Sequence, residues 1–206
     1  MADFILAHKK VNKSEGGYSN NPNDRGNYVD GNLVGTNYGI SAPVLKEHLG
    51  RTPTKDDMIN LSPKVVLLIY KKNYWNKIQG DNIDNQSVAY LIYDSAVNQG
   101  LSYTKSAIKE ALFEQGEEYE GINANQINKL NQKDFFLSIF RNRLDRYSMG
   151  AKEFKKGWIN RLNEIKFIGK NDKSKYYLIA SLLFLSTISI LILIKITKWK
   201  IGKKKY

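Results

Sequence analysis

The chain of 206 residues contains no cysteine and only two histidines, His8 and His48. The lack of cysteine excludes disulfides, thiol catalysis and cysteine-bound zinc or iron–sulfur sites. Two histidines are too few for a multi-histidine metal centre, and both side chains are expected on helix surfaces. Neither a metal nor an organic cofactor is predicted. No glycine-rich phosphate loop, Ser/His/Asp nucleophile set or metal-ligand spacing is visible.

Long uncharged apolar runs are missing until the end of the chain, where Tyr176–Ile194 carries no charge. A helix of that length spans roughly 28 Å, close to the hydrocarbon thickness of a bilayer. The sequence therefore predicts a transmembrane helix over 176–196, a linker over 169–175 and a basic tail over 197–206. The flanking residues that suit the interfaces and headgroups are Lys166, Lys170, Lys173, Lys175, Tyr176, Tyr177 and Trp199.

Positive charge is unevenly spread along the chain. The formal net charge is +12, and half of it comes from six lysines that follow the uncharged run ending at Ile194. The positive-inside bias places the C-terminus in the cytoplasm and the large domain on the side of the cell wall, in a host inner membrane or an internal virion membrane. The opening "MADFILAHKK" does not have the pattern of a secretory signal, so the sequence does not explain how the domain crosses a membrane.

Residues 1–168 are predicted to be mainly α-helical, with loops or a small hairpin over 18–40. Gly50 and Gly100 are the expected helix stops, while Ser41 and the Ser62–Pro63 pair are the expected caps. Basic "RNRLDR" at 141–146 is interpreted as a solvated helix face, so nucleic acid is not a predicted partner. The predicted helices cover residues 4–14, 41–50, 62–78, 85–100, 102–115, 133–150 and 152–166, with an acidic loop over 114–126.

The stretch "SEGGYSNNPNDRG" holds the candidate for catalysis. Glu15 lies where a helix meets a glycine-rich turn, Asp24 follows nine residues later, and Thr36 follows in "GTNYGI". Two carboxylates flanking a bond are the minimal set for glycoside hydrolysis, one as the acid and one as the ionised partner. Side chains that suit binding of a sugar chain are Tyr18, Asn20, Asn21, Asn37 and Tyr38. The alternative is a solvated turn in which Glu15 merely ends a helix.

Several motifs, in order, resemble one family. "EGGYSNNPND" and "GTNYGIS" are similar to the signature of the N-acetylmuramidases of glycoside hydrolase family 108, and "YKKNYW", "YDSAVNQG" and "FKKGWINRL" resemble its later motifs. The resemblance covers about residues 1–166. It implies a lysozyme-like helical fold, with a catalytic half over 1–80 and a peptidoglycan-associated half over 81–168 of the same globular unit. It also implies that Glu15 is the catalytic glutamate.

The second catalytic group is less defined. Phage-type lysozymes, to which the chain is distantly similar, place an aspartate nine residues after the glutamate and a threonine soon after, which implies Asp24 and Thr36. However, the inserted "NYVDGNLV" at 27–34 separates Gly26 from Gly35 and supplies Asp30 as another candidate. Asp94 and Asn98 lie one helical turn apart and either line the cleft or brace a neighbouring helix. Trp75 and Trp158 are expected to anchor the core, and Arg161 is expected to pair with an acid.

The predicted function is a membrane-anchored peptidoglycan hydrolase that cleaves the β-1,4 bond between N-acetylmuramic acid and N-acetylglucosamine, for phage lysis or entry. Its partners are peptidoglycan glycan strands and the lipid bilayer. The alternatives are a non-catalytic wall-binding or structural membrane protein, a bacterial wall-remodelling or secretion-assisting muramidase, and a holin-like membrane-permeabilising protein. Retention or inversion, and the oligomeric state, are left open.

Overall fold

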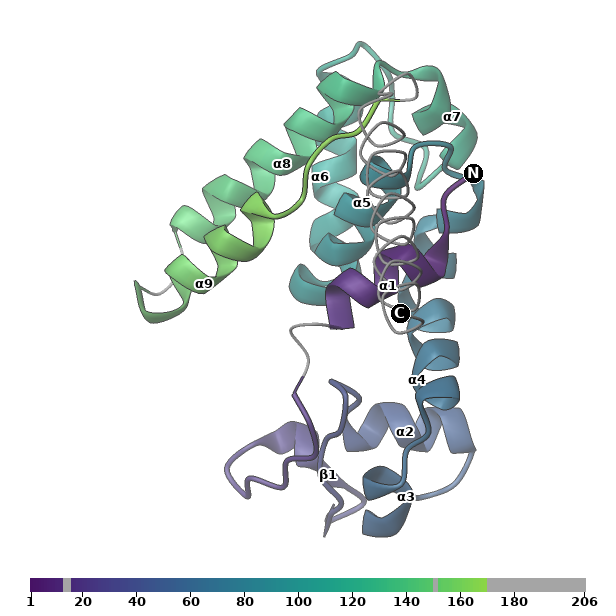
Figure 1. Cartoon of the computed structure of the whole chain (residues 1–206), viewed down its shortest axis with the longest axis vertical. Helices are drawn as coiled ribbons and strands as arrows, with labels where there is room; N and C mark the ends of the chain where they lie inside the picture. The colour runs from purple at the N-terminus through teal and green to yellow at the C-terminus, as the bar shows by residue number, and fades with distance from the viewer. Residues whose placement is uncertain (13–15, 150–151, 170–206) are drawn as a thin grey trace, which may run out of the picture. The chain divides into compact units, whose positions relative to one another are not determined.

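The computed structural model describes residues 1–12, 16–149 and 152–169. Residues 1–168 form one compact unit, which is mainly helical, as predicted (Figure 1). Within the described ranges no helix is both long enough and apolar enough to cross a membrane. The predicted span over 176–196 and the basic tail lie outside the described residues.

The first part of the unit contains short helices and one hairpin. Figure 1 shows α4 running from the group formed by α2, α3 and the hairpin to the middle of the unit, where α1 lies. A π-helical turn over Lys71–Trp75 and a 3-10 turn over Asn76–Ile78 continue α4. The elements are α1 (Phe4–Asn12), β1 (Tyr28–Val29), β2 (Asn32–Leu33), α2 (Ala42–Leu49), α3 (Lys55–Ile59) and α4 (Pro63–Tyr70).

The second part consists of packed helices. Helix α5 is the most buried of them and contacts α1, α6 and α8, while α9 packs along α8 (Figure 1). The elements are α5 (Gln86–Gln99), α6 (Leu101–Phe113), α7 (Ala124–Lys129), α8 (Gln132–Ser148) and α9 (Lys152–Asn163).

Most helix boundaries follow from local capping. Ser62 accepts a hydrogen bond from the Val65 amide at the start of α4, and Gly50 ends α2 in the left-handed conformation, both as predicted. The sequence prediction missed α3 and α7, which have five and six residues. Helices this short have no readable apolar stripe. Their signal is the cap alone, such as the capping box of Thr54 and Asp57.

The predicted hairpin is confirmed. Strands β1 and β2 pair antiparallel, with Tyr28 opposite Leu33 and Val29 opposite Asn32. The turn between them is Asp30–Gly31, and both residues have positive φ, 50° and 78°. An Asp-Gly pair with two left-handed residues makes the two-residue turn whose twist matches a hairpin. Asp30 is thus the first residue of the hairpin turn, and its backbone conformation is set by that turn.

An aromatic cluster joins α1 to α4 and α5. Trp75 is fully buried, as predicted, and its Nε1 donates to Asp81 at 2.7 Å. The expectation that His8 lies on a helix surface is wrong. His8 is 4% exposed, packs against Phe4 and Tyr70, and has its Nδ1 2.9 Å from the Tyr93 hydroxyl. Burial lowers the pKa of His8 below its ordinary value.

A buried ion-pair network joins α5, α8 and α9. Arg143 is fully buried, and its Nη2 donates to Asp94 Oδ2 at 2.6 Å and to the Tyr147 hydroxyl at 2.9 Å. Arg161 donates to the other oxygen of Asp94 at 2.9 and 3.0 Å, as its predicted pairing with an acid requires. The interpretation of residues 141–146 as a solvated face is therefore wrong for Arg143, although Arg141 and Arg146 are exposed.

Candidate functional site

The predicted catalytic acid Glu15 lies outside the described residues. The structure describes α1 up to Asn12 and the chain again from Gly16. What it describes around the predicted site is the loop and hairpin region over 16–40, which holds Asp24, Thr36 and most of the predicted sugar-binding residues.

Backbone hydrogen bonds bring the two motifs of this region together. The amide of Ser19 donates to the Thr36 carbonyl, and the amide of Thr36 donates to the Ser19 carbonyl, both at 2.8 Å. The Tyr18 hydroxyl donates to the Val34 carbonyl at 3.2 Å. Residues seventeen positions apart in the sequence therefore lie side by side, which places "GGYS" next to "GTNY".

The backbone of Gly35 lies directly against Tyr18 and Ser19 where the two segments meet. Its φ is +98°, and a Cβ there would lie 2.6 Å from a Tyr18 ring atom and 2.7 Å from the Ser19 carbonyl oxygen. Neither the positive φ nor the space suits a side chain.

We therefore expect Gly35→Ala to destabilise the domain by about 2 kcal/mol, through backbone strain and displacement of Tyr18. Thermal unfolding measures the loss. Gly31→Ala is the matched control: Gly31 also has positive φ, but an added Cβ there meets nothing within 4 Å, so it should cost clearly less. Equal losses in the two variants would show that the close approach at Gly35 is not the cause.

Asp24 is an exposed carboxylate with one oxygen engaged. Its Oδ1 accepts from the Gly26 amide at 2.8 Å and thereby caps the 3-10 turn Arg25–Asn27. Within the part of the chain that the structure describes, its other oxygen and the half-buried hydroxyl of Thr36 make no hydrogen bond. Both groups are thus available to a ligand or to a water molecule.

Asp30, the other candidate for the second catalytic group, is already engaged. Both of its carboxylate oxygens accept from Lys46 Nζ at 2.7 Å, and one also accepts from the Thr52 hydroxyl. These contacts lower the pKa of Asp30, the hydrogen bond from Lys46 most of all. A carboxylate held by an ammonium group and a hydroxyl on a hairpin turn is a weaker candidate than Asp24.

The predicted sugar-binding residues do not share one environment. Asn20 is exposed and Tyr18 is half-buried. Tyr38 is half-buried and lines a pocket of about 400 Å³ between α1 and α4, together with His8 and Pro63. Asn37 is 5% exposed, and its Nδ2 donates to the Met58 carbonyl at 2.9 Å. Asn37 therefore holds α3 in place instead of presenting its amide to a ligand.

Asp94 and Asn98, which the sequence placed on one helix face, have different surroundings. Asp94 is fully buried between two arginines, so it braces α8 and α9, the second of its two predicted roles, and it does not line an open cleft. Asn98 is exposed, donates to the Asp94 carbonyl at 2.7 Å and lines a different pocket, between α5, α6, α8 and α9. Sequence reasoning missed this pocket because its residues come from four helices and share no spacing.

No group of three or more His, Asp or Glu side chains suited to a metal ion occurs among the described residues. Among the described residues, the loop and hairpin region over 16–40 instead offers a free oxygen of Asp24, the free hydroxyl of Thr36, and aromatic and amide side chains. Such groups can bind a polar polymer and stabilise a developing positive charge.

Comparison with known proteins relates part of the chain to one family. Residues 8–100 match the family Glycosyl hydrolase 108, a range that includes Glu15, Asp24 and Thr36. Among solved structures, the chain is similar to SagA of Brucella abortus, with 27% sequence identity and a TM-score of 0.59, over 79% of this chain and 90% of that chain. No curated protein sequence matches the chain. The match over residues 8–100 and the similarity to SagA thus support a glycoside hydrolase of the N-acetylmuramidase type that acts on peptidoglycan.

Proposed function

We propose that the protein is a membrane-anchored N-acetylmuramidase that cleaves the β-1,4 bond between N-acetylmuramic acid and N-acetylglucosamine. The observation that carries the proposal is the family match over residues 8–100, which includes the Glu15 turn and the paired Thr36 segment.

In the proposed mechanism, Glu15 is the general acid and protonates the glycosidic oxygen as the bond breaks. Asp24 is the second group, because its free carboxylate oxygen can stabilise the oxocarbenium-like state or position a water molecule. The Thr36 hydroxyl, which is also free of hydrogen bonds within the described ranges, assists in holding that water. Tyr18, Asn20 and Tyr38 bind the sugar chain.

Release of reducing ends from purified peptidoglycan tests this function. The proposal expects new reducing ends to appear in proportion to the fall in turbidity of the wall suspension. A protein that binds the walls and releases no reducing ends would be the non-catalytic wall-binding protein instead.

We further propose that residues 176–196 anchor the enzyme in a bilayer, with the domain on the side of the cell wall. The support is the uncharged run Tyr176–Ile194 followed by six lysines. A tether next to the wall raises the local enzyme concentration without any new substrate contact. Such an anchored muramidase fits a role in phage lysis or entry, and a bacterial role in wall remodelling is the second candidate.

Deletion of residues 176–206 should move the protein from the membrane pellet to the soluble fraction and leave its muramidase activity within about twofold. The physical reason is that the compact unit ends at Ile168 and has its own core. Fractionation of cells that produce the full chain and the truncated chain measures this. A truncated protein that still pellets with membranes would place an anchor elsewhere in the chain.

A further inference from the structure

A second pocket lies far along the sequence from the predicted catalytic residues. Its volume is about 680 Å³, and it is lined by the end of α5, the start of α6, the last turns of α8 and the middle of α9. Nothing in the proposed mechanism uses it. The residues that give it a chemical character are Gln99, Tyr103, Asp145, Arg146, Tyr147 and Trp158.

Aromatic rings form the walls of this pocket. Trp158 was expected to anchor the core, but it is 37% exposed and lines the pocket. Its ring lies 5.5 Å from that of Tyr147, with 30° between the ring planes. An exposed tryptophan beside a tyrosine presents a rigid apolar surface, which packs well against an aliphatic chain or a flat group.

Arg146 supplies a positive charge at this pocket. Its guanidinium carbon lies 4.4 Å from the centroid of the Tyr103 ring. Arg146 is exposed, and no carboxylate in the described part of the chain forms an ion pair with it. Stacking on the ring leaves the edge of the guanidinium free, and its parallel N–H groups match the two oxygens of a carboxylate.

Gln99 supplies a second donor at the same pocket. Its Oε1 accepts from Arg143 Nε at 2.8 Å. Because arginine only donates, this contact fixes which end of the amide is the oxygen. The Nε2 group is then a buried donor, and in the described residues it finds no acceptor. A buried unpaired donor favours a ligand or a water that brings an oxygen.

The cation, the free hydrogen-bond donor and the aromatic wall together favour a ligand that carries an anionic group attached to an apolar or peptide chain. The glycan of peptidoglycan is neutral once the lactyl carboxyl groups are amidated, whereas its stem peptides carry free carboxylates and ammonium groups. Asp145, at the rim beside Arg146, can accept from such an ammonium group. We propose that this pocket binds the stem peptide of peptidoglycan through its carboxylate, an inference that rests on peptidoglycan being the substrate.

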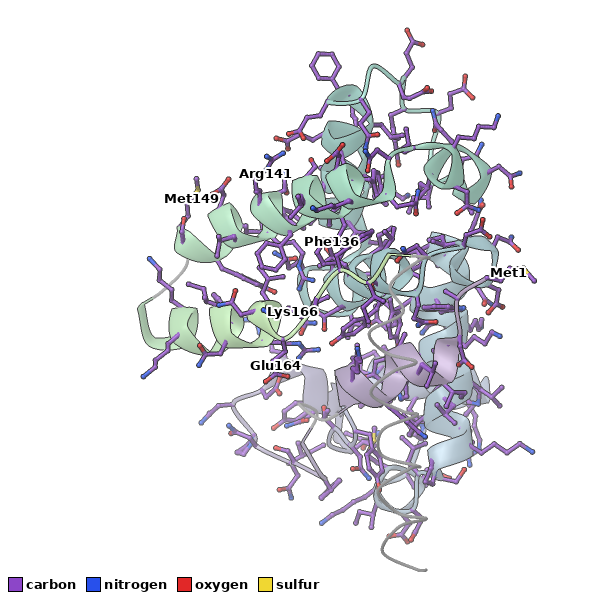
Figure 2. All side chains as sticks on the ribbon, turned by 45° about the horizontal axis from the view of Figure 1, so that its top comes forward. Met1, Phe136, Arg141, Met149, Glu164 and Lys166 are labelled. Atoms are coloured by element: carbon purple, nitrogen blue, oxygen red, sulfur yellow. The ribbon has the colours of Figure 1, made fainter. Side chains whose placement is uncertain are left out.

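Binding of a free stem peptide to the full chain tests the inference. The probe is the tripeptide L-Ala-γ-D-Glu-meso-diaminopimelate, and titration calorimetry measures its affinity. Arg146→Gln should weaken binding about tenfold or more, because it removes a charge-assisted bidentate contact. The matched control is Arg141→Gln, which removes the same charge from an exposed position on α8 that pairs with Glu114 and faces away from α9 (Figure 2). It should bind like the wild type.

Kinetics separate this inference from the proposed function. Arg146→Gln should raise KM about tenfold on intact peptidoglycan and leave kcat unchanged, because the contact is equally strong in the ground and transition states. On glycan strands stripped of peptide by an amidase, the variant and the wild type should have equal KM. Reducing ends released by the wild type from both substrates report the proposed function on their own. Failure of the wild type to bind the tripeptide, or equal affinity in Arg146→Gln, would overturn the stem-peptide site.

Discussion

Glu15→Gln should lower the rate of wall lysis by about 10²–10⁴-fold, because general acid catalysis contributes a factor of that size. Glutamine keeps the size and polarity of the side chain but cannot give a proton to the leaving oxygen. Binding of peptidoglycan should persist, since only the transition state needs the proton. A turbidity assay on purified cell walls measures the rate, and a pull-down with the same walls measures binding.

Glu47→Gln is the matched control for this experiment. Glu47 is an exposed acid on α2 that pairs with Lys72 at 3.7 Å, and it lies outside the predicted site. Its loss should leave lysis within about twofold. If Glu15→Gln cleared the walls as fast as the wild type, Glu15 would not be the acid, and the mechanism would need another proton donor.

Asp94→Asn should destabilise the protein by about 3–5 kcal/mol, which corresponds to a fall in Tm on the order of 10 °C. The carboxylate is fully buried and receives one hydrogen bond from Arg143 and two from Arg161. Burial opposes the charge on Arg143, but the neighbouring Asp94 holds the pKa of that guanidinium above its ordinary value. Without the carboxylate, a buried cation remains with no counter-charge.

Arg141→Gln is the comparison for the buried network. Arg141 is on α8, like Arg143, and its ion pair of 2.8 Å with Glu114 at the end of α6 is lost, but both partners are well exposed, 63% and 42%. Exposed pairs contribute about 0–1 kcal/mol, so Tm should fall by no more than a few degrees. Equal losses in the two variants would mean that Asp94 is not the structural link between α5, α8 and α9.

Elements with a strong local signal could be predicted from the sequence. Ser62–Pro63 and Gly50 mark helix ends, and the Asp30–Gly31 turn lies within the predicted loop or hairpin region. Here local hydrogen bonding and backbone preference decide the structure, and both are readable from a few neighbouring residues. The pairing of Arg161 with an acid was likewise predicted and is present.

Tertiary context decided the features that the sequence did not reveal. Arg143 lies in a charged stretch whose pattern is typical of a surface helix. It is nevertheless buried, because the carboxylate of Asp94, 49 residues earlier, compensates its positive charge. His8 is buried through contacts with Tyr70 and Tyr93, which are remote in sequence. Asn37 looks like a sugar ligand in its motif, but it binds the carbonyl of Met58. In each case the partner comes from a segment that is distant in the sequence, so a local sequence pattern does not reveal the contact.

The same argument applies to the candidate site. The sequence placed the "EGGYSNNPND" and "GTNYGIS" motifs in one family signature but did not show that their segments are in contact. The structure brings Ser19 and Thr36 together through paired backbone hydrogen bonds and the close approach at Gly35. The similarity to phage-type lysozymes implied Asp24, but the inserted segment left Asp30 as another candidate, and both are exposed aspartates in polar loops. The preference for Asp24 depends on Lys46 and Thr52, which engage Asp30 and leave Asp24 with a free oxygen.

Mass analysis of the fragments that the protein releases from purified peptidoglycan tests the central claim most directly. The account predicts disaccharide–peptide fragments with N-acetylmuramic acid at the reducing end, produced by the wild type and not by Glu15→Gln. Fragments that end in N-acetylglucosamine, or peptides freed from intact glycan strands, would contradict it, because either result would place the cut at a different bond.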